Sequence, residues 1–143
     1  MGASFQCFVH GVDDDVDMAY SAVSRYRAYL MEMCGLREEY DQYHQMASRY
    51  DPDVEKAFES LMKTVVQKFH ETDEDKYLGV CYFVDHSDCD GEFSAEQCEY
   101  IAKAFDALLE TDIIWDEDDR TKIIDLAELF EATAEQNGIM RIF

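Results

Sequence analysis

Apolar residues recur at three- and four-residue intervals along most of this chain, and this spacing constrains the fold more than any other feature. Such a period places apolar side chains on one face of an α-helix. One stripe runs through Ala19, Val23, Tyr26, Leu30 and Met33. The stripes predict about five helices: from a cap at Asp15 or Asp17 to Gly35, from Leu36 to about Tyr50, from Asp51 to near His70, from Ser94 past Leu108, and from Asp116 to Gly138.

Three shorter segments have the character of strands. Phe5, Cys7 and Val9 alternate with polar or small residues, as do the residues of the tail 139–143. The run Tyr77–Val84 (YLGVCYFV) is short, aromatic and β-branched, so we expect it to be the central strand. The sequence therefore predicts an α+β fold, mostly helical, with about five helices packed on a small two- or three-stranded sheet in one domain, 1–143.

The helix starts carry local signals. Ser94 followed by Gln97 is a capping box, and Asp51-Pro52 is typical of an N-cap followed by proline at the first helical position. The acidic run Asp116–Asp119 favours the positive end of a helix dipole.

The composition is strongly acidic, with 33 Asp and Glu against 12 Lys and Arg and a formal net charge of −21. Self-repulsion of this size opposes the compact state, and no fold requires it. Direct binding of nucleic acid or of an anionic membrane is disfavoured. A cationic partner is favoured, with solubility alone as the other explanation of the charge.

The five cysteines are an odd number without a Cys-x-x-Cys pair, which predicts reduced thiols. The N-terminal residues lack a basic segment followed by an apolar one, and no apolar run has the length of a membrane span. We therefore expect a cytoplasmic protein.

The segment 85–98 (DHSDCDGEFSAEQC) has the spacing of a degenerate EF-hand loop. With Gly91 at the sixth position, calcium ligands would fall at alternate residues. A histidine in the first position and Gln97 in the twelfth depart from the pattern, and a tight acidic turn with Gly91 at positive φ is the alternative. The candidate metal ligands are His86, Asp88, Asp90, Glu92 and Ser94.

Two resemblances fall on the same residues. His86-x-Asp88-x-Asp90-Gly91 after an apolar run resembles the first metal-binding motif of the DHH phosphoesterases, but no histidine follows His86 to complete a two-metal site. The phrase VDHSDCDGEFSAEQC resembles a segment of uncharacterised bacterial and phage proteins. This second resemblance implies a phage or prophage origin in a bacterial cell, and it implies no activity.

The acidic residues are concentrated in 85–119, which holds thirteen Asp and Glu and one basic residue, Lys103. Helical spacing predicts that most of them share one exposed face. The candidate partner-binding residues are Glu92, Glu96, Glu99, Asp106, Glu110, Asp112, Asp116, Glu117, Asp118 and Asp119.

These patterns favour a non-enzymatic binding protein without a cofactor. We expect it to inhibit a nucleic-acid-handling protein, such as a host-defence nuclease, by imitating nucleic acid on that protein's basic surface. The alternative function is a calcium- or metal-binding module built on the loop at 86–97.

Overall fold

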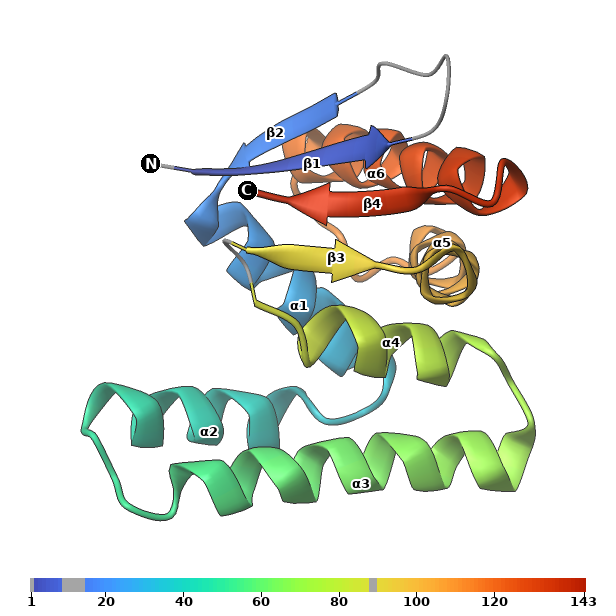
Figure 1. The fold of residues 1–143 in the computed structure, drawn as a ribbon. Coiled ribbons are helices and arrows are strands. Elements are labelled where there is room, and N and C mark those ends of the chain that lie inside the picture. Colours follow the sequence, from blue (N-terminus) through green and yellow to red (C-terminus); the bar gives the residue numbers. More distant parts are fainter. Residues whose placement is uncertain (1, 9–14, 88–89) are drawn as a thin grey trace.

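The computed structural model describes residues 2–8, 15–87 and 90–143 and confirms a mostly helical α+β fold, 66% helical. Within these residues there are six helices and a four-stranded antiparallel sheet (Figure 1). In chain order the elements are β1 (Gly2–Phe8), β2 (Asp15–Ala19), α1 (Tyr20–Met33), α2 (Arg37–Ser48), α3 (Val54–Thr72), α4 (Lys76–Val84), β3 (Gly91–Phe93), α5 (Ala95–Leu109), α6 (Glu117–Glu135) and β4 (Ile139–Ile142).

The sheet has the strand order β2-β1-β4-β3, so its two central strands come from the two ends of this chain. Phe5 pairs with Val16 on one side and with Ile142 on the other. Both predicted terminal strands are thereby confirmed, except that Val9 of the first lies outside the described residues.

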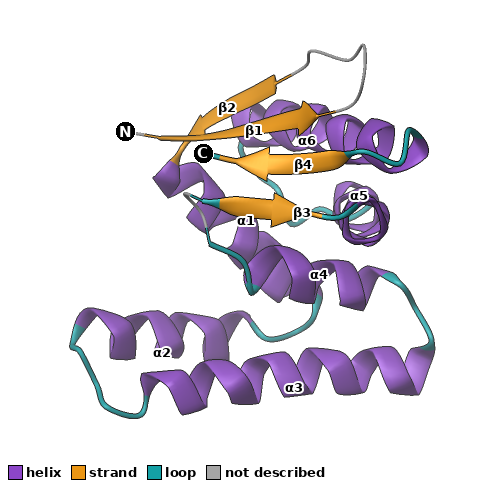
Figure 2. Ribbon diagram, in the orientation of Figure 1, coloured by secondary structure: helices purple, strands orange, loops and turns teal. Residues whose placement is uncertain are grey.

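One face of the sheet is buried against helices, and the other is open. Phe5 and Cys7 of β1 and Met140 and Ile142 of β4 are buried, as period-two alternation requires. α6 contacts β1, β2 and β4, α1 contacts β1 and β2, and α5 contacts β3 and β4. Figure 2 shows this single layer of strands with α6 behind it.

Five phenylalanine rings join the sheet to the helices in the centre of the core. Phe130 lies 6.0 Å from Phe5 and 5.4 Å from Phe93 between ring centroids, both edge-on. Phe83 meets Phe105 edge-on at 5.0 Å. These are favourable aromatic geometries, and they tie α4, α5 and α6 to the sheet.

The prediction of a central strand at Tyr77–Val84 is wrong, because these residues form helix α4. α4 packs on α3, α5 and α1, and none of Tyr77–Val84 is exposed. A helix that is covered on all sides is apolar all round and loses the periodic stripe that would identify it. Its short aromatic run therefore resembled a buried strand.

The expected helix cap at Asp15 or Asp17 is also wrong, because both residues lie in strand β2 and α1 begins at Tyr20 after Ala19. In β2 the exposed Asp15 and Asp17 alternate with Val16 and the buried Met18. This alternation is itself a strand signal, and β2 pairs with β1 up to Ala19, the N-cap residue of α1, which makes no side-chain cap hydrogen bond.

The α2–α3 hairpin lies apart from the sheet, and α4 lies between them (Figure 1). α3 begins at Val54, later than the expected N-cap at Asp51. Asp51 instead accepts a hydrogen bond from the Asp53 backbone N–H at 2.8 Å in the turn before the helix. Among the described residues, no helix is long and apolar enough to cross a membrane.

Candidate functional site: an acidic surface centred on α6

Helix α5 presents the acidic face that its spacing predicted. Its capping box is complete: the Gln97 N–H donates to Ser94 Oγ at 3.1 Å, and the Ser94 N–H donates to Gln97 Oε1 at 2.9 Å. From this start, Cys98, Ile101, Phe105 and Leu108 point into the core. The opposite face carries the exposed residues Glu96, Glu99, Lys103, Asp106 and Glu110.

Helix α6 and strand β2 extend this surface with carboxylates that the sequence analysis did not select. Four of them, Asp125, Glu128, Glu131 and Glu135, recur along the exposed face of α6. Their spacing of three and four residues is visible in the sequence, but they lie beyond Asp119, where the densest acidic segment ends. Asp15 and Asp17 could be placed beside α6 only from the sheet topology.

Two grooves flank α6 and are lined mainly by these acids. The groove between α5 and α6 has a volume of about 320 Å³ and is lined by Glu99, Lys103, Asp106, Glu131 and Glu135, among others. The groove between β2 and α6 has a volume of about 530 Å³, and its lining includes Asp15, Asp17, Lys122, Asp125 and Glu128. We call the exposed carboxylates of both grooves the α6 acidic surface: Asp15, Asp17, Glu99, Asp106, Asp125, Glu128, Glu131 and Glu135.

The two lysines that line these grooves have local partners. Lys103 Nζ lies 2.8 Å from Asp75 Oδ2 and 3.6 Å from Glu99 Oε1. Lys122 Nζ donates to the Asp17 carbonyl oxygen at 2.8 Å. The hydrogen bond to Asp75 is the main cause that raises the Lys103 pKa above its ordinary value. The ammonium group of Lys103 is therefore paired mainly with Asp75, at the edge of the surface.

Negative charge is crowded on this surface at Asp106. Burial raises the pKa of the Asp106 carboxyl above its ordinary value, and the like charge of Glu110 raises it further. A cation that approached Asp106 would favour its ionised form and offset this repulsion.

Asp119 lies away from the exposed acidic residues with which it was grouped, because its side chain is buried. Arg25 donates to it twice, from Nε to Oδ2 and from Nη2 to Oδ1, both at 2.8 Å. The Tyr29 hydroxyl donates to Oδ2, also at 2.8 Å. The Arg25 hydrogen bond is the main cause that holds the Asp119 pKa below its ordinary value. Asp119 therefore joins α6 to α1 and is not available to a partner.

The remaining predicted acids lie at the edges of the surface or on another face. Asp116 is half-buried and caps α6 by accepting from the Asp119 N–H at 3.1 Å, while Asp112, Glu117 and Asp118 are exposed beside it. Glu92 lies on the open face of the sheet, where Arg141 Nη2 contacts its Oε1 at 2.8 Å. It does not join the acidic face of α5.

The loop that was predicted to bind metal is organised around His86. The His86 ring stacks on Phe93 with centroids 3.9 Å apart, and its two nitrogens lie 2.8 Å from the Ser87 carbonyl oxygen and 3.0 Å from the Glu92 carbonyl oxygen. Arg27 donates to the His86 carbonyl oxygen. Both ring nitrogens therefore face backbone acceptors.

The other candidate ligands are also engaged elsewhere or lie apart. Ser94 caps α5 and Glu92 pairs with Arg141, while Asp90 is exposed. Asp88 falls outside the described residues. Within the described ranges, no three His, Cys, Asp or Glu side chains are grouped closely enough to hold a metal ion. Calcium binding by this loop stays a prediction.

Gly91 has the positive φ that the turn predicted, at +130°. A Cβ atom added there would lie 2.7 Å from His86 Cε1. We expect Gly91→Val to lower the free energy of unfolding by about 2 kcal/mol through backbone strain and displacement of the His86 ring. Urea unfolding followed by circular dichroism measures this loss. Glu92→Val is the matched control, because it places the same side chain one residue on in the strand. An equal loss in both variants would contradict the role given to Gly91.

Three of the described thiols are poorly suited to covalent catalysis. Cys34 and Cys98 are buried, and burial raises the pKa of each to about 12. Burial likewise raises the pKa of Cys81 to about 11. Since the thiolate is the reactive form, these cysteines are poor nucleophiles at neutral pH.

Comparison of the chain with protein-family models, with curated proteins and with solved structures finds no match. Its function has to be inferred from its own surface.

Proposed function

We propose that this protein is a non-enzymatic inhibitor that binds the basic surface of a nucleic-acid-handling protein, such as a host-defence nuclease. The observation that carries the proposal is the α6 acidic surface, where eight exposed carboxylates line two grooves beside one helix. Ordinary exposed helices intersperse Lys and Arg among their acids for pairing three and four residues apart. Here the lysines in the grooves are already engaged.

The dimensions of α6 suit a partner that binds a duplex. A helix of 19 residues is about 28 Å long, which is most of one turn of B-form DNA. Charged side chains three and four residues apart lie about 5–6 Å from one another. A duplex carries one phosphate charge per ~1.7 Å of its axis, so the surface imitates its charge coarsely rather than phosphate by phosphate.

Such a surface would act mainly by electrostatic attraction. Long-range attraction speeds the encounter of oppositely charged proteins and weakens as salt screens it. Burial and the like charge of Glu110 both disfavour the ionised form of Asp106, and a basic partner would offset both effects.

The test is capture of partners on the immobilised protein from a bacterial lysate, followed by elution with increasing salt and, separately, with duplex DNA. We expect basic, nucleic-acid-binding proteins to be retained at low salt and released by both treatments. A retained protein is then purified, and its affinity is measured by calorimetry. The proposal would be contradicted if no basic protein is retained, or if the affinity does not depend on ionic strength.

Two variants, each with four fewer negative charges, distinguish recognition of the α6 acidic surface from recognition of the net charge of the protein. The first carries Asp125→Asn, Glu128→Gln, Glu131→Gln and Glu135→Gln on α6. The control carries Glu38→Gln, Glu39→Gln, Asp53→Asn and Glu71→Gln on the α2–α3 hairpin. We expect the α6 variant to bind the captured partner at least about tenfold more weakly and the control to bind like wild type. Equal weakening would show that net charge alone is recognised.

A further inference from the structure

Helix α3 carries no net charge within a strongly acidic chain. It contains three acids and three lysines and is therefore neutral, within a protein of formal charge −21. Like charge opposes contact between copies of an acidic protein. α3 adds no net charge of its own to that repulsion.

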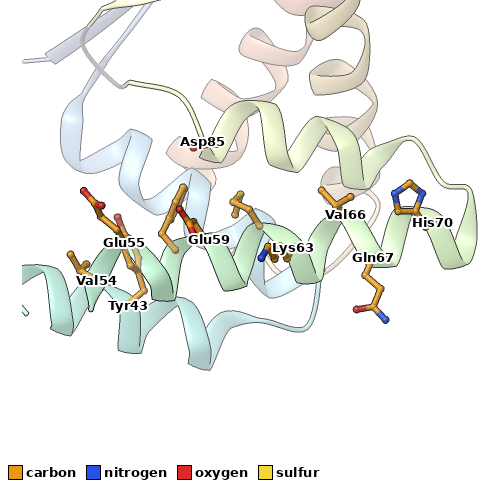
Figure 3. Close-up of a pocket in the computed structure, with 11 residues that line it drawn as sticks. Tyr43, Val54, Glu55, Glu59, Lys63, Val66, Gln67, His70 and Asp85 are labelled. Atoms are coloured by element: carbon orange, nitrogen blue, oxygen red, sulfur yellow. The ribbon is translucent and has the colours of Figure 1, made fainter. Parts of the chain in front are cut away.

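The apolar face of α3 is only partly covered. Leu61 and Val65 are buried, whereas Phe58, Met62 and Val66 are half-buried. The half-buried side chains line an open groove of about 750 Å³ together with Tyr43 of α2 (Figure 3). An apolar groove of this kind marks an interaction surface.

The charges along this groove are ordered from one end to the other. Glu55, Glu59 and Asp85 lie at the end near the start of α3, and Lys63 and His70 follow towards its other end (Figure 3). A surface with acids at one end and bases at the other is complementary to itself when it is turned around. Self-complementarity of this kind is what a twofold-symmetric interface between identical chains requires.

We propose that two copies of this chain associate through α3, packed antiparallel about a twofold axis near Met62. In this arrangement the Met62 side chains of both copies meet at the centre, and Val66 of each copy lies opposite Phe58 of the other. Glu59 of each copy lies near Lys63 of the other, and Glu55 lies near His70. The apolar residues supply the attraction, and the charge order fixes the antiparallel direction.

The position of α3 in the fold is compatible with this contact. α3 and α6 lie at opposite ends of the molecule, with α4 and α5 packed between them (Figure 1). Association through α3 therefore keeps the two α6 acidic surfaces far apart and open to solvent. The dimer does not depend on the proposed function, and each can fail without the other.

Sedimentation equilibrium of the full chain, from low micromolar to near-millimolar concentration, tests the proposal. We expect a concentration-dependent monomer–dimer equilibrium that becomes tighter as salt rises, because screening reduces the repulsion between two strongly acidic copies. The complex proposed above, between the α6 acidic surface and a basic partner, should instead become weaker as salt rises. Wild type that stays monomeric at every concentration and salt would overturn the proposal and leave the groove to a different occupant.

Substitutions locate the interface. Met62→Glu and Val66→Glu should each weaken the dimer at least about tenfold, because each places a carboxylate inside the apolar contact. Ser60→Glu adds the same charge to an exposed position of α3 that does not line the groove, so it should dimerise nearly like wild type. Circular dichroism establishes that each variant is folded. Equal weakening by Ser60→Glu would overturn the assignment to this groove.

A charge exchange tests the antiparallel arrangement. Glu59→Lys alone should weaken the dimer, because it faces Lys63 of the second copy with a like charge. The double variant Glu59→Lys/Lys63→Glu restores an opposite-charge pair across the twofold axis and should recover most of the affinity. A double variant that dimerises more weakly than Glu59→Lys would exclude the arrangement in which Glu59 of one copy lies near Lys63 of the other.

Discussion

Gly79→Ala is expected to lower the free energy of unfolding by about 3 kcal/mol. Gly79 lies inside α4 where that helix packs most closely on α5. A Cβ atom at this position would overlap the carbonyl oxygen of Tyr100 and would lie 2.8 Å from the Cβ of Ala104. Neither the backbone oxygen nor the alanine methyl can rotate away, so the two helices must separate. Alanine's higher helix propensity, about 1 kcal/mol over glycine, offsets only part of this cost.

Gly35→Ala is the control for this variant. Gly35 has a φ of +75°, and a Cβ atom added there would have no neighbour within 4 Å. Its replacement should cost only the left-handed backbone conformation, about 1–2 kcal/mol. Urea unfolding of both variants and wild type gives the comparison. A Gly79→Ala protein as stable as Gly35→Ala would show that α4 and α5 are not in close contact.

Asp119→Ala is expected to cost about 3 kcal/mol. The substitution removes three short hydrogen bonds to a buried carboxylate and leaves the Tyr29 hydroxyl, on a buried residue, without this acceptor. Arg25 is half-exposed and can regain water, which keeps the loss at the lower end of the range for a broken buried ion pair. Asp118→Ala is the control, because Asp118 precedes it in the same turn and is exposed. Similar losses in both variants would contradict the structural role of Asp119.

The contribution of Asp119 should depend on pH with a definite sign. Its pKa in the folded protein lies below its ordinary value, chiefly because Arg25 donates to it. The unfolded chain therefore binds the proton more tightly, and the stabilisation is complete above the ordinary carboxyl pKa. It declines as the pH falls through that value and is lost below the folded pKa. The stability difference between wild type and Asp119→Ala, measured by urea unfolding at a series of pH values, should shrink accordingly towards acid.

The fold class and most helices could be predicted because surface helices carry an apolar stripe. Helix α5 shows why: Ser94 and Gln97 specify its start locally, and Ile101, Phe105 and Leu108 specify its inward face. Helix α4 could not be predicted in this way. None of Tyr77–Val84 is exposed, so its sequence shows no apolar stripe, and its close approach to α5 at Gly79 is a tertiary contact that the local sequence does not reveal.

The acidic surface could be predicted only in part. Exposure of Glu96, Glu99, Asp106 and Glu110 follows from helical spacing. The exclusion of Asp119 does not, because its partner Arg25 lies in a different helix far away in the sequence. The groove on α3 was also missed, since helical spacing does not show that the apolar face of α3 is covered on one side only.

The central pair of strands has a consequence for how the chain folds. Phe5 of β1 pairs with Ile142 of β4, which lies 137 positions later in the sequence. On a ribosome, β1 and β2 can form a hairpin early and the helices can collapse locally, but the middle of the sheet stays open until the last residues of this segment have left the tunnel. Pairing over such a distance raises the contact order of an otherwise helical protein and slows its final step. During that interval the buried face of β1, with Ala3, Phe5 and Cys7, is exposed to other chains. The abundance of carboxylates that repel those chains then acts as a built-in safeguard against aggregation during synthesis.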